Sequence, residues 1–495
     1  MWHNREVMQI KDIPQEVRTV SEALESAGFE AYLVGGCVRD LLLQKTPKDW
    51  DVATNATPEH IQTIFPDSFY ENDFGTVGVK TESENDTLKV IEVTPYRKEG
   101  TYSDARRPDT VEFGVSLSED LTRRDFTVNA IAFRVQTGEL VDEHSGKEDL
   151  HKKVLRTVGD PDQRFSEDAL RMMRAVRLSA ELGFAIGDET AQAIATNAEK
   201  LSKISKERIR DELIRILETK EPMQSIFISQ KLGLLKYIAP DLERGVGVAQ
   251  NQAHSFDVFE HLLRTMQHAA DKDWELAIRL AGLFHDVSKP ETRRWSDEKK
   301  DWTFHGHEVV GARVTKKALI DLRFPKELIE RAVKLVRWHM FFSDPDQITL
   351  SAVRRMIQNV GEENIHDLLN LRICDRIGTG RPKEQPFRFR KYKAMVDEAL
   401  RDPLSVKMLA IDGADIMKAF NEKPGPRIGW VLHALLEEVL DDPNKNTIEH
   451  LEIRTRELLT LSDKELRSLG EQGKMRLEKE EEEAVQEIQK KHHVS

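Results

Sequence analysis

The chain has 495 residues, of which 39% are hydrophobic and 33% are charged, and its formal net charge is −13. This length is too great for one hydrophobic core, so we expect roughly three or four compact units. The acidic balance excludes a uniformly basic nucleic-acid-binding protein, and any surface for a polyanion has to be a local basic strip.

Cysteine usage and hydropathy bear on location. Cys37 and Cys374 lie far apart and have no metal-ligand spacing, which argues against a disulfide framework and for a reducing compartment. The N-terminal segment lacks the apolar stretch of a signal peptide, and no segment approaches the roughly 20 apolar residues of a membrane span. We therefore expect a cytoplasmic protein without a membrane partner.

The first part of the chain predicts a small α/β domain that ends near residue 140. An amphipathic helix over 14–29 precedes a β-prone run at 31–34. Further strands are expected at 77–80, 88–94, 111–115 and 130–135.

Beyond Gly159 the apolar positions follow a helical period almost to the end of the chain. Helices are expected over 166–182, 206–218, 258–270, 274–284, 309–320, 326–340 and 428–440. The densely charged segment 474–491 predicts a solvated helix or disorder. The expected fold class is α+β, with a mixed sheet and its helices first and an all-α remainder.

A glycine pair and a carboxylate pair follow the first strand. Gly35 and Gly36 stand between a strand and a helix, where bare backbone N–H groups can bind a triphosphate, and Arg39 can reach the same phosphates. On a strand, Asp49 and Asp51 project to one face and can hold two Mg²⁺ ions for phosphoryl transfer. Either pair alone is often surface decoration, whereas the ordered set is far more specific.

The segment 167–182 is expected to form one helix with a polar face. Asp168, Arg171, Arg174 and Arg177 recur every three residues along it. Cytosine and adenine both present an amino donor beside a ring-nitrogen acceptor, so an aspartate and an arginine together can accept C and A and reject U and G. The alternative is an ordinary ion pair on a solvated helix.

These motifs resemble, in this order, those of the class II tRNA nucleotidyltransferases, or CCA-adding enzymes, and of the related bacterial poly(A) polymerases. The resemblance rests on Gly-Gly-Cys-Val-Arg-Asp at 35–40, Asp-Trp-Asp-Val-Ala-Thr at 49–54, Arg-Arg-Asp-Phe-Thr-Val-Asn-Ala at 123–130 and the segment 164–177. It implies that Asp49 and Asp51 are catalytic ligands of Mg²⁺. The nucleotide contacts that it implies are Gly35, Gly36, Arg39, Arg124 and the template Asp168 and Arg171 for CTP or ATP, assisted by Arg174 and Arg177.

The resemblance also implies a domain order. A polymerase-β-like nucleotidyltransferase head is expected over 1–143, a helical neck over 144–215, a helical body over 216–395 and a tail over 396–495. The implied partner is tRNA, whose acceptor stem and elbow would lie along the body and tail.

Two features near the head motifs have less specific interpretations. Glu92 is a candidate third carboxylate of the metal site, although a structural role on its strand is the simpler interpretation. Segment 94–108 resembles the flexible loop with which family members switch from CTP to ATP, and a plain exposed hairpin loop is the alternative.

Basic residues cluster locally in this acidic chain. One group consists of Arg156, Arg164, Lys200, Lys203, Lys206, Arg208, Arg210 and Arg215. Within it, segment 205–212 is expected to stabilise the neck helices. Segment 381–393 interleaves cations with aromatic residues, which suits contact with phosphates and bases, and a helix-capping linker is the alternative.

A second candidate site resembles an HD phosphohydrolase domain over about 254–376. Its ordered set is His261, His285, Asp286, His307, His339 and Asp375. Imidazoles and carboxylates on facing helices can hold transition-metal ions that activate water for phosphoester hydrolysis. A metal-free scaffold is the alternative.

The expected function is the addition of CCA to tRNA 3′ ends from CTP and ATP with Mg²⁺. An enzyme that adds only the terminal A and a poly(A) polymerase are the alternatives within this class. A metal-dependent HD hydrolase with a vestigial head is the alternative from another class.

Overall fold

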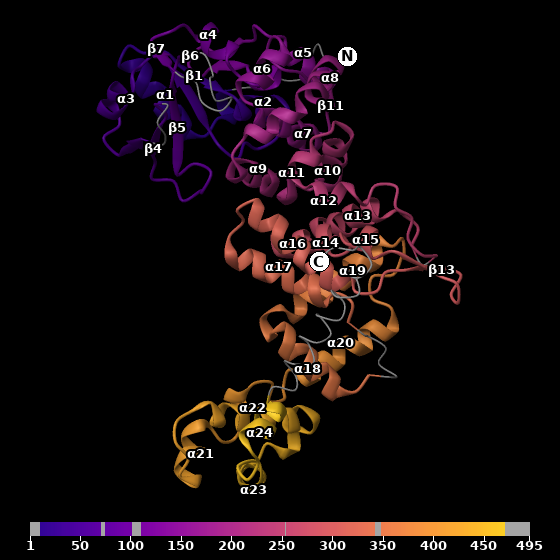
Figure 1. Cartoon of the computed structure of the whole chain (residues 1–495). Helices are drawn as coiled ribbons and strands as arrows, with labels where there is room; N and C mark the ends of the chain where they lie inside the picture. Colours follow the sequence, from indigo (N-terminus) through magenta and orange to yellow (C-terminus); the bar gives the residue numbers. More distant parts are fainter. Residues whose placement is uncertain (1–9, 71–74, 101–109, 253, 342–347, 471–495) are drawn as a thin grey trace. The chain divides into compact units, whose positions relative to one another are not determined.

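The computed structural model describes residues 10–70, 75–100, 110–252, 254–341 and 348–470, and all structural statements below concern these residues. The chain forms two compact units, Met1–Ile238 and Ala239–Ser495 (Figure 1). The finer division at residues 143, 215 and 395 stays a prediction.

A seven-stranded mixed sheet forms the centre of the first unit, in the strand order β3-β4-β5-β2-β1-β8-β9. Its strands are β1 Ala31–Val34, β2 Asp51–Thr54, β3 Ser68–Tyr70, β4 Val77–Lys80, β5 Val90–Pro95, β8 Ala132–Arg134 and β9 Glu139–Val141. Strands β2 and β5 are parallel, and the other neighbours are antiparallel. All four residues of β1 are buried, as its apolar sequence predicts.

A hairpin of β6 Arg97–Glu99 and β7 Val111–Phe113 stands beside the sheet. The flexible-loop prediction falls mainly on residues 101–109, which lie outside the described part of the chain.

Helices flank this sheet and continue beyond it. They are α1 Gln15–Ser26, α2 Gly36–Leu42, α3 Pro58–Ile64, α4 Leu117–Thr122, α5 Gly146–Lys152, α6 Pro161–Glu167, α7 Leu170–Leu182, α8 Asp188–Asn197, α9 Lys206–Glu218, α10 Pro222–Lys231 and α11 Leu235–Ile238. Between α5 and α8 runs a short parallel pair, β10 Val154–Leu155 and β11 Ala185–Ile186.

The prediction of one helix over 167–182 is wrong at its start. Helix α6 ends at Glu167, and Asp168 adopts an extended conformation before α7 begins at Leu170. The carboxylate of Asp168 accepts the backbone N–H of Leu170 at 3.0 Å. A short carboxylate side chain that can accept this N–H favours a helix boundary over a helix interior.

The second unit is helical except for one hairpin. Its helices are α12 Pro240–Glu243, α13 Val258–Asp271, α14 Leu276–Phe284, α15 Lys289–Thr292, α16 His307–Asp321, α17 Lys326–Trp338, α18 Leu350–Val360, α19 Ile365–Gly378, α20 Phe387–Ala399, α21 Gly413–Phe420, α22 Pro426–Asp441, α23 Ile448–Leu458 and α24 Asp463–Gly470. None of the described helices is long and apolar enough to span a bilayer.

The sequence predicted an all-α remainder, but the second unit also contains one β-hairpin. Strands β12 Arg294–Ser296 and β13 Asp301–Thr303 form an antiparallel hairpin, in which Trp295 pairs with Trp302. The tryptophan rings meet edge to face at 5.3 Å, and such cross-strand aromatic pairs stabilise a short hairpin.

Helices α13 and α19 pack closely because the last residue of α19 is glycine. A Cβ atom on Gly378 would lie 2.2 Å from Thr265 Oγ1 and 3.1 Å from His261 Nδ1. Only a residue without a side chain fits there. This close approach brings Asp375 of α19 to the buried histidine of α13.

Candidate functional sites

The carboxylates of Asp49 and Asp51 meet at the glycine pair. A Cβ atom on Gly35 would lie 3.1 Å from Asp51 Oδ2, and one on Gly36 would lie 3.7 Å from Asp49 Oδ1. Gly35 has φ = 77°, a conformation that side chains disfavour. Strand β2 begins only at Asp51, so Asp49 reaches the turn from the preceding loop and not from a strand. Two carboxylates beside an open backbone cradle fit a pair of hard cations.

Glu92 lies next to this carboxylate pair. In the parallel ladder of β2 and β5, Glu92 is the direct register partner of Asp51. Register partners in adjacent strands point to the same face of the sheet, so the two carboxylates share one face. The third-carboxylate prediction therefore has the placement that it requires.

An aspartate that the sequence did not single out fixes Arg124. Asp120 accepts Arg124 Nη2 at 3.0 Å and Arg123 Nη2 at 2.7 Å. Burial opposes the charge on Asp120, but the two guanidiniums outweigh it and lower the pKa of this carboxyl. Arg124 Nη1 would lie 3.5 Å from a Cβ on Gly35, so this cation is held beside the glycine pair.

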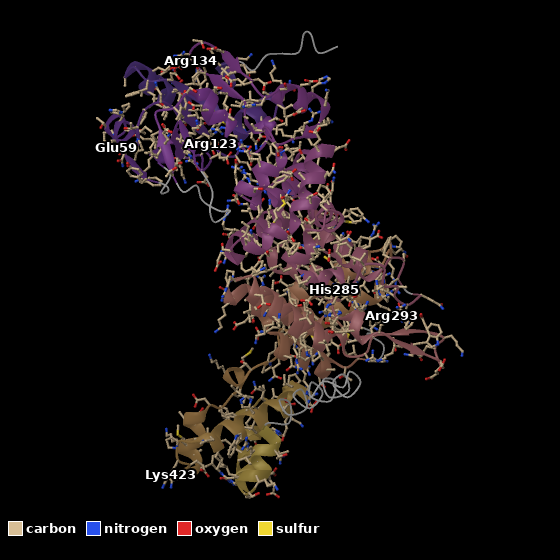
Figure 2. All side chains as sticks on the ribbon, turned by 45° about the horizontal axis from the view of Figure 1, so that its top comes forward. Glu59, Arg123, Arg134, His285, Arg293 and Lys423 are labelled. Atoms are coloured by element: carbon tan, nitrogen blue, oxygen red, sulfur yellow. The ribbon has the colours of Figure 1, made fainter. Side chains whose placement is uncertain are left out.

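A cavity of about 540 Å³ opens from these groups. It is lined by Gly35, Gly36, Asp51, Arg97, Arg123, Arg124, Asp125, Asn129, Asp168, Leu170, Arg171, Arg174, Arg208, Asp211, Glu212 and Arg215. The arginines make it the local basic surface that the acidic composition requires. Figure 2 labels Arg123 among the side chains of the first unit.

Asp168 and Arg171 line this cavity together, but they do not form an ion pair with one another. Both oxygens of Asp168 accept from Arg208 of α9, at 3.2 and 2.7 Å. Arg171 Nη1 donates to Glu167 at 2.5 Å, and its Nη2 donates to the backbone carbonyl of Arg123. Each side chain thus has an ionic partner other than the one that the sequence suggested, and both belong to the cavity lining.

The two arginines predicted to assist the template differ in position, because only Arg174 belongs to the cavity lining. Arg174 lines the cavity and makes two bonds to Asp125 Oδ2, at 2.9 and 2.7 Å. Arg177 is not among the described lining residues; it donates to Glu212 of α9 at 2.6 Å and to Glu181. These bonds tie α7 to α9, which is the stabilising role expected for segment 205–212.

Two other arginines of the first unit are held in place by hydrogen bonds. Arg164 is buried and donates to the carbonyl of Val158 and to Glu167, so it is unsuited to contact RNA phosphates. Arg39 donates to Asn129 at 2.8 Å, which joins the glycine turn to the motif at 123–130. Asp120, Asp125 and Asn129 were missed as individual site residues, although Asp125 and Asn129 lie inside that motif, and Arg208 was expected only as a member of the basic group.

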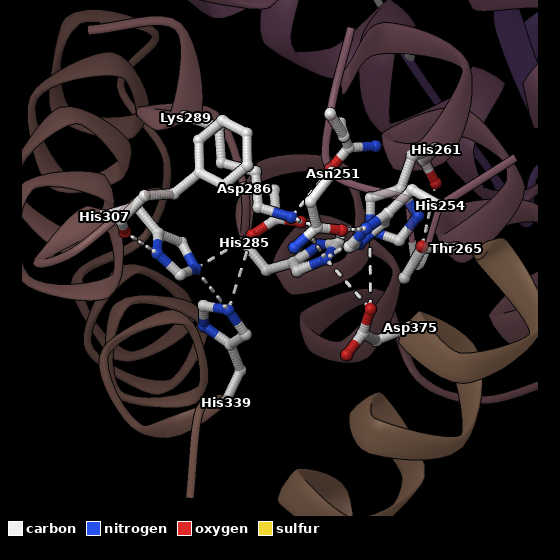
Figure 3. Close-up of polar contacts among 12 residues, drawn as sticks. Asn251, His254, His261, Thr265, His285, Asp286, Lys289, His307, His339 and Asp375 are labelled. Carbon is white, nitrogen blue, oxygen red and sulfur yellow. Dashed lines mark hydrogen bonds and ion pairs between the residues drawn. The ribbon is translucent and has the colours of Figure 1, made fainter. Parts of the chain in front are cut away.

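The six predicted residues of the second site come together in the second unit (Figure 3). Two groups with suitably close ligand atoms share Asp286: His261, His285, Asp286 and Asp375 form one, and Asp286, His307 and His339 form the other. His261 Nε2 lies 3.0 Å from Asp286 Oδ2, and His307 Nε2 lies 3.1 Å from Asp286 Oδ1. All six side chains are buried.

The backbone fixes the tautomers of three of these histidines. His285, His307 and His339 each direct Nδ1 at the carbonyl of the residue three positions earlier, at 2.9, 2.6 and 2.7 Å. A carbonyl only accepts, so Nδ1 carries a proton, and only the neutral form of such a ring presents a lone pair on Nε2. Histidine metal ligands are commonly oriented by such a hydrogen bond from the other ring nitrogen.

Lone pairs therefore face one another across the cluster. The Nε2 atoms of His307 and His339 are 3.3 Å apart, and Asp286 Oδ1 is buried without a hydrogen bond. Burial is the main cause that lowers the pKa of His339 to about 4, and the charge of neighbouring His285 acts in the same direction. Burial opposes a charge on His285, but Asp286 and Asp375 outweigh it and raise the pKa of His285 to about 9. Such a donor set calls for a cation, and imidazole with carboxylate suits transition metals.

The cluster opens into a cavity of about 1080 Å³. Two lining residues that the sequence did not single out are His254 and Lys289. Lys289 Nζ lies 2.5 Å from Asp286 Oδ2 and 3.3 Å from His254 Nε2. The basic and aromatic segment 381–393 supplies part of the lining, including Arg381, Phe387 and Arg388.

Three family models match the sequence. The Poly A polymerase head domain matches residues 31–156, the probable RNA and SrmB-binding site of polymerase A matches residues 183–245, and the HD domain matches residues 258–378.

Curated relatives match over most of the chain. The CCA-adding enzyme of Levilactobacillus brevis is 32% identical over 445 residues, which cover 88% of this chain and 96% of the relative. The CCA-adding enzyme of Limosilactobacillus reuteri is 44% identical over 245 residues, which cover 48% of this chain and 58% of the relative.

Solved structures agree with these relatives. The Bacillus stearothermophilus CCA-adding enzyme in complex with CTP has a TM-score of 0.63 and 26% identity, covering 90% of this chain and 99% of the other. The Thermotoga maritima CCA-adding enzyme complexed with tRNA has a TM-score of 0.56 at 20% identity, covering 92% and 99%, and this likeness concerns the fold.

Proposed function

The chain belongs to the family of CCA-adding enzymes, and on this premise we propose that it adds C, C and A to the 3′ end of tRNA from CTP and ATP, without a nucleic-acid template. The observation that carries the proposal is a single cavity whose lining includes Gly35, Gly36 and Asp51 together with Asp168 and Arg171. Groups for the triphosphate, the reaction and the base therefore share one space.

Each side chain has a task in this reaction. Gly35 and Gly36 allow the triphosphate to approach the backbone, and Arg39 and Arg124 stand beside them to bind its charge. Asp49 and Asp51 hold Mg²⁺, which when bound lowers the pKa of the attacking hydroxyl and neutralises the departing pyrophosphate.

The base is selected by Asp168 and Arg171 of the same cavity lining. Asp168 accepts the exocyclic amino group of C or A, and Arg171 donates to the ring nitrogen beside it. Asp168 Oδ1 already accepts from Leu170 and Arg208, whereas Oδ2 accepts from Arg208 alone and can accept one further hydrogen bond from the base. Uracil and guanine would place acceptor against acceptor and donor against donor, which leaves buried polar groups unpaired.

Three tRNA transcripts distinguish the possible products. Transcripts that end in the discriminator base, in C or in CC are incubated with CTP, ATP and Mg²⁺, and the products are sequenced. We expect complete CCA on all three. A added only to the third transcript would indicate the partial enzyme, and long A tails would indicate a poly(A) polymerase.

Replacing Glu92 tests the third carboxylate. Glu92→Gln keeps the size of the side chain and removes its charge beside Asp51. We expect the rates of CMP and AMP addition to fall by about 10- to 100-fold, because the metals lose a neighbouring negative charge. Exposed Glu82→Gln serves as the matched control. A rate for Glu92→Gln within twofold of the wild type would assign Glu92 a structural role.

A second activity is favoured by the cluster around Asp286. We propose that this cluster holds one or two transition-metal ions and hydrolyses phosphoesters. Support comes from the unbonded Asp286 Oδ1 and from the lone pairs that His307 and His339 direct at the same place. Bound metal would supply an activated water for the attack. Lys289 belongs to the cavity lining, and its buried ammonium group pairs with Asp286 at 2.5 Å.

Metal analysis tests this second proposal. After dialysis against a chelator and reloading with Mn²⁺ or Ni²⁺, we expect the protein to retain up to two ions and His285→Ala to retain fewer. The exposed His366→Ala on α19 is the matched control, and thermal unfolding checks that each variant is folded. Equal metal content in the wild type and in His285→Ala would contradict the proposed site.

Location and RNA contact stay proposals as well. We place the protein in the cytosol, in accord with its two free, buried cysteines. We also propose that the acceptor stem and elbow of tRNA contact the helices beyond the head.

A further inference from the structure

Cationic side chains extend beyond the six-residue cluster along the lining of the same cavity. Arg372 and Arg376 belong to α19, Arg381 follows that helix, and all three line the cavity. Arg372 Nη1 donates to Asp375 Oδ2 at 2.5 Å, so its charge supports the cluster. Arg376 Nε donates to the carbonyl of Lys383 at 2.6 Å, which uses one of its five N–H donors and fixes the side chain.

The guanidiniums of Arg372, Arg376 and Arg381 all belong to the lining of one cavity. The carboxylate of Glu384 on the same wall is already paired with Lys272 at 2.8 Å. Like charges gathered at a cavity cost stability, and an anionic ligand removes that cost. The wall is therefore suited to bind a phosphate.

Aromatic side chains stand beside the cations. Phe387, at the start of α20, is 72% exposed and lines the cavity. Trp302 lines it as well, and one face of its ring is covered by the guanidinium of Arg293 at 3.6 Å from the ring centre. An exposed aromatic ring beside phosphate-binding cations is the arrangement with which proteins stack the bases of single-stranded nucleic acids.

We propose that this cavity binds the end of a short oligonucleotide, with the phosphate to be cleaved at the six-residue cluster and a second phosphate at Arg376 and Arg381. A base would then stack on Phe387. The inference rests on the hydrolase activity proposed above, and it names the class of substrate for that site. A volume of about 1080 Å³ exceeds the need of a single phosphate group and accommodates a dinucleotide.

The reaction is a hydrolysis that needs water alone as co-reactant. The oxygen of a water molecule bonds to phosphorus, and the bond from phosphorus to the departing nucleoside oxygen breaks. One proton of the water goes to that oxygen. The products are a phosphate monoester and a free hydroxyl group, with no change in oxidation state.

Two dinucleotides that differ by one phosphate test the proposal. Full-length protein loaded with Mn²⁺ is assayed on pApA and on ApA, which lacks the 5′-phosphate. We expect the KM for pApA to be about 10-fold lower, because a charge-assisted contact holds the extra phosphate. In the Arg376→Gln, Arg381→Gln double variant we expect the KM for pApA to rise to that for ApA. Arg313→Gln, an exposed arginine on α16 that does not line the cavity, is the matched control.

Calorimetric titration with adenosine 3′,5′-bisphosphate provides a measurement that is independent of cleavage. We expect its Kd to rise about 10-fold in the double variant and to stay unchanged in Arg313→Gln. The second-phosphate site would be overturned if the KM values for pApA and ApA were equal and if the Kd values of the wild type and the double variant were equal. If the protein retained metal in that case, the hydrolase proposal would still stand. A protein that retains no metal and cleaves neither dinucleotide would overturn both.

Discussion

Asp51→Asn is expected to lower CMP and AMP addition together by about 10³-fold or more. The substitution keeps the shape of the side chain and removes one of the two negative charges at the glycine pair. Binding of Mg²⁺ then weakens, and the charge that develops on the triphosphate is no longer neutralised. The measurement is single-turnover incorporation of labelled CMP into a transcript that ends in the discriminator base, and of AMP into one that ends in CC.

The control for this variant is an aspartate of the same unit that is far from any glycine turn. Asp86→Asn alters an exposed turn residue and should leave both rates unchanged. Thermal unfolding of Asp51→Asn should match that of the wild type. If either CMP or AMP addition survives at a normal rate, the two reactions do not share this metal site.

Asp168→Ala is expected to lower both the rate of nucleotide addition and the selectivity for C and A over U and G. The variant removes the acceptor for the amino group of C and A, so addition of both should fall by about 10- to 100-fold. Addition of U should fall far less, since the carboxylate no longer opposes its carbonyl oxygen. Incorporation of CTP, ATP, UTP and GTP, measured one at a time on the same transcript, gives the ratios. Unchanged selectivity against UTP and GTP would refute the template.

Arg208 provides the second arm of this experiment. Its guanidinium holds both oxygens of Asp168, so Arg208→Ala releases the carboxylate without removing it. We expect a smaller loss of selectivity than in Asp168→Ala. Arg210→Ala, on the same helix but outside the cavity lining, is the matched control for loss of an arginine from α9.

Local signals in the sequence predicted much of the first unit. Apolar runs bounded by turn residues predicted strands at 77–80 and 111–115, and the structure has β4 at 77–80 and β7 at 111–113. The glycine pair and the two aspartates were recognisable because ordered motifs surround them. Their convergence at one turn follows from the antiparallel pairing of β1 with β2, which a residue pattern does not specify.

Contacts between distant segments were beyond such reasoning. The period of three along 168–177 suggested one helix face, but a capping bond to Leu170 breaks the helix and sends Asp168 to Arg208, 40 residues away. Arg177 shares that period and nevertheless pairs with Glu212. Charged residues have many possible partners, and the packing of helices selects among them.

The residues of the second site could be predicted from the sequence, but their arrangement in space could not. Six residues in the expected order predicted a cluster, and the structure brings all six together. The role of Asp286 in both ligand groups could not be read from spacing, because it depends on the packing of α13, α14, α16, α17 and α19. The same holds for segment 381–393, whose chemistry was evident but whose place on this cavity was not.

Hydrogen bonds to the main chain, made by His285, His307 and His339, affect how easily point mutations can destroy the cluster during evolution. Each ring is oriented by a carbonyl oxygen of its own local backbone, and an amino-acid substitution does not delete a carbonyl. Apart from Gly378, which must lack a side chain for α13 and α19 to pack, point mutations can therefore abolish the donor set chiefly at the donors themselves. Among homologous chains, identity at the six positions and a glycine at position 378 should then separate those that retain the cluster from those in which the same helices persist for their packing alone.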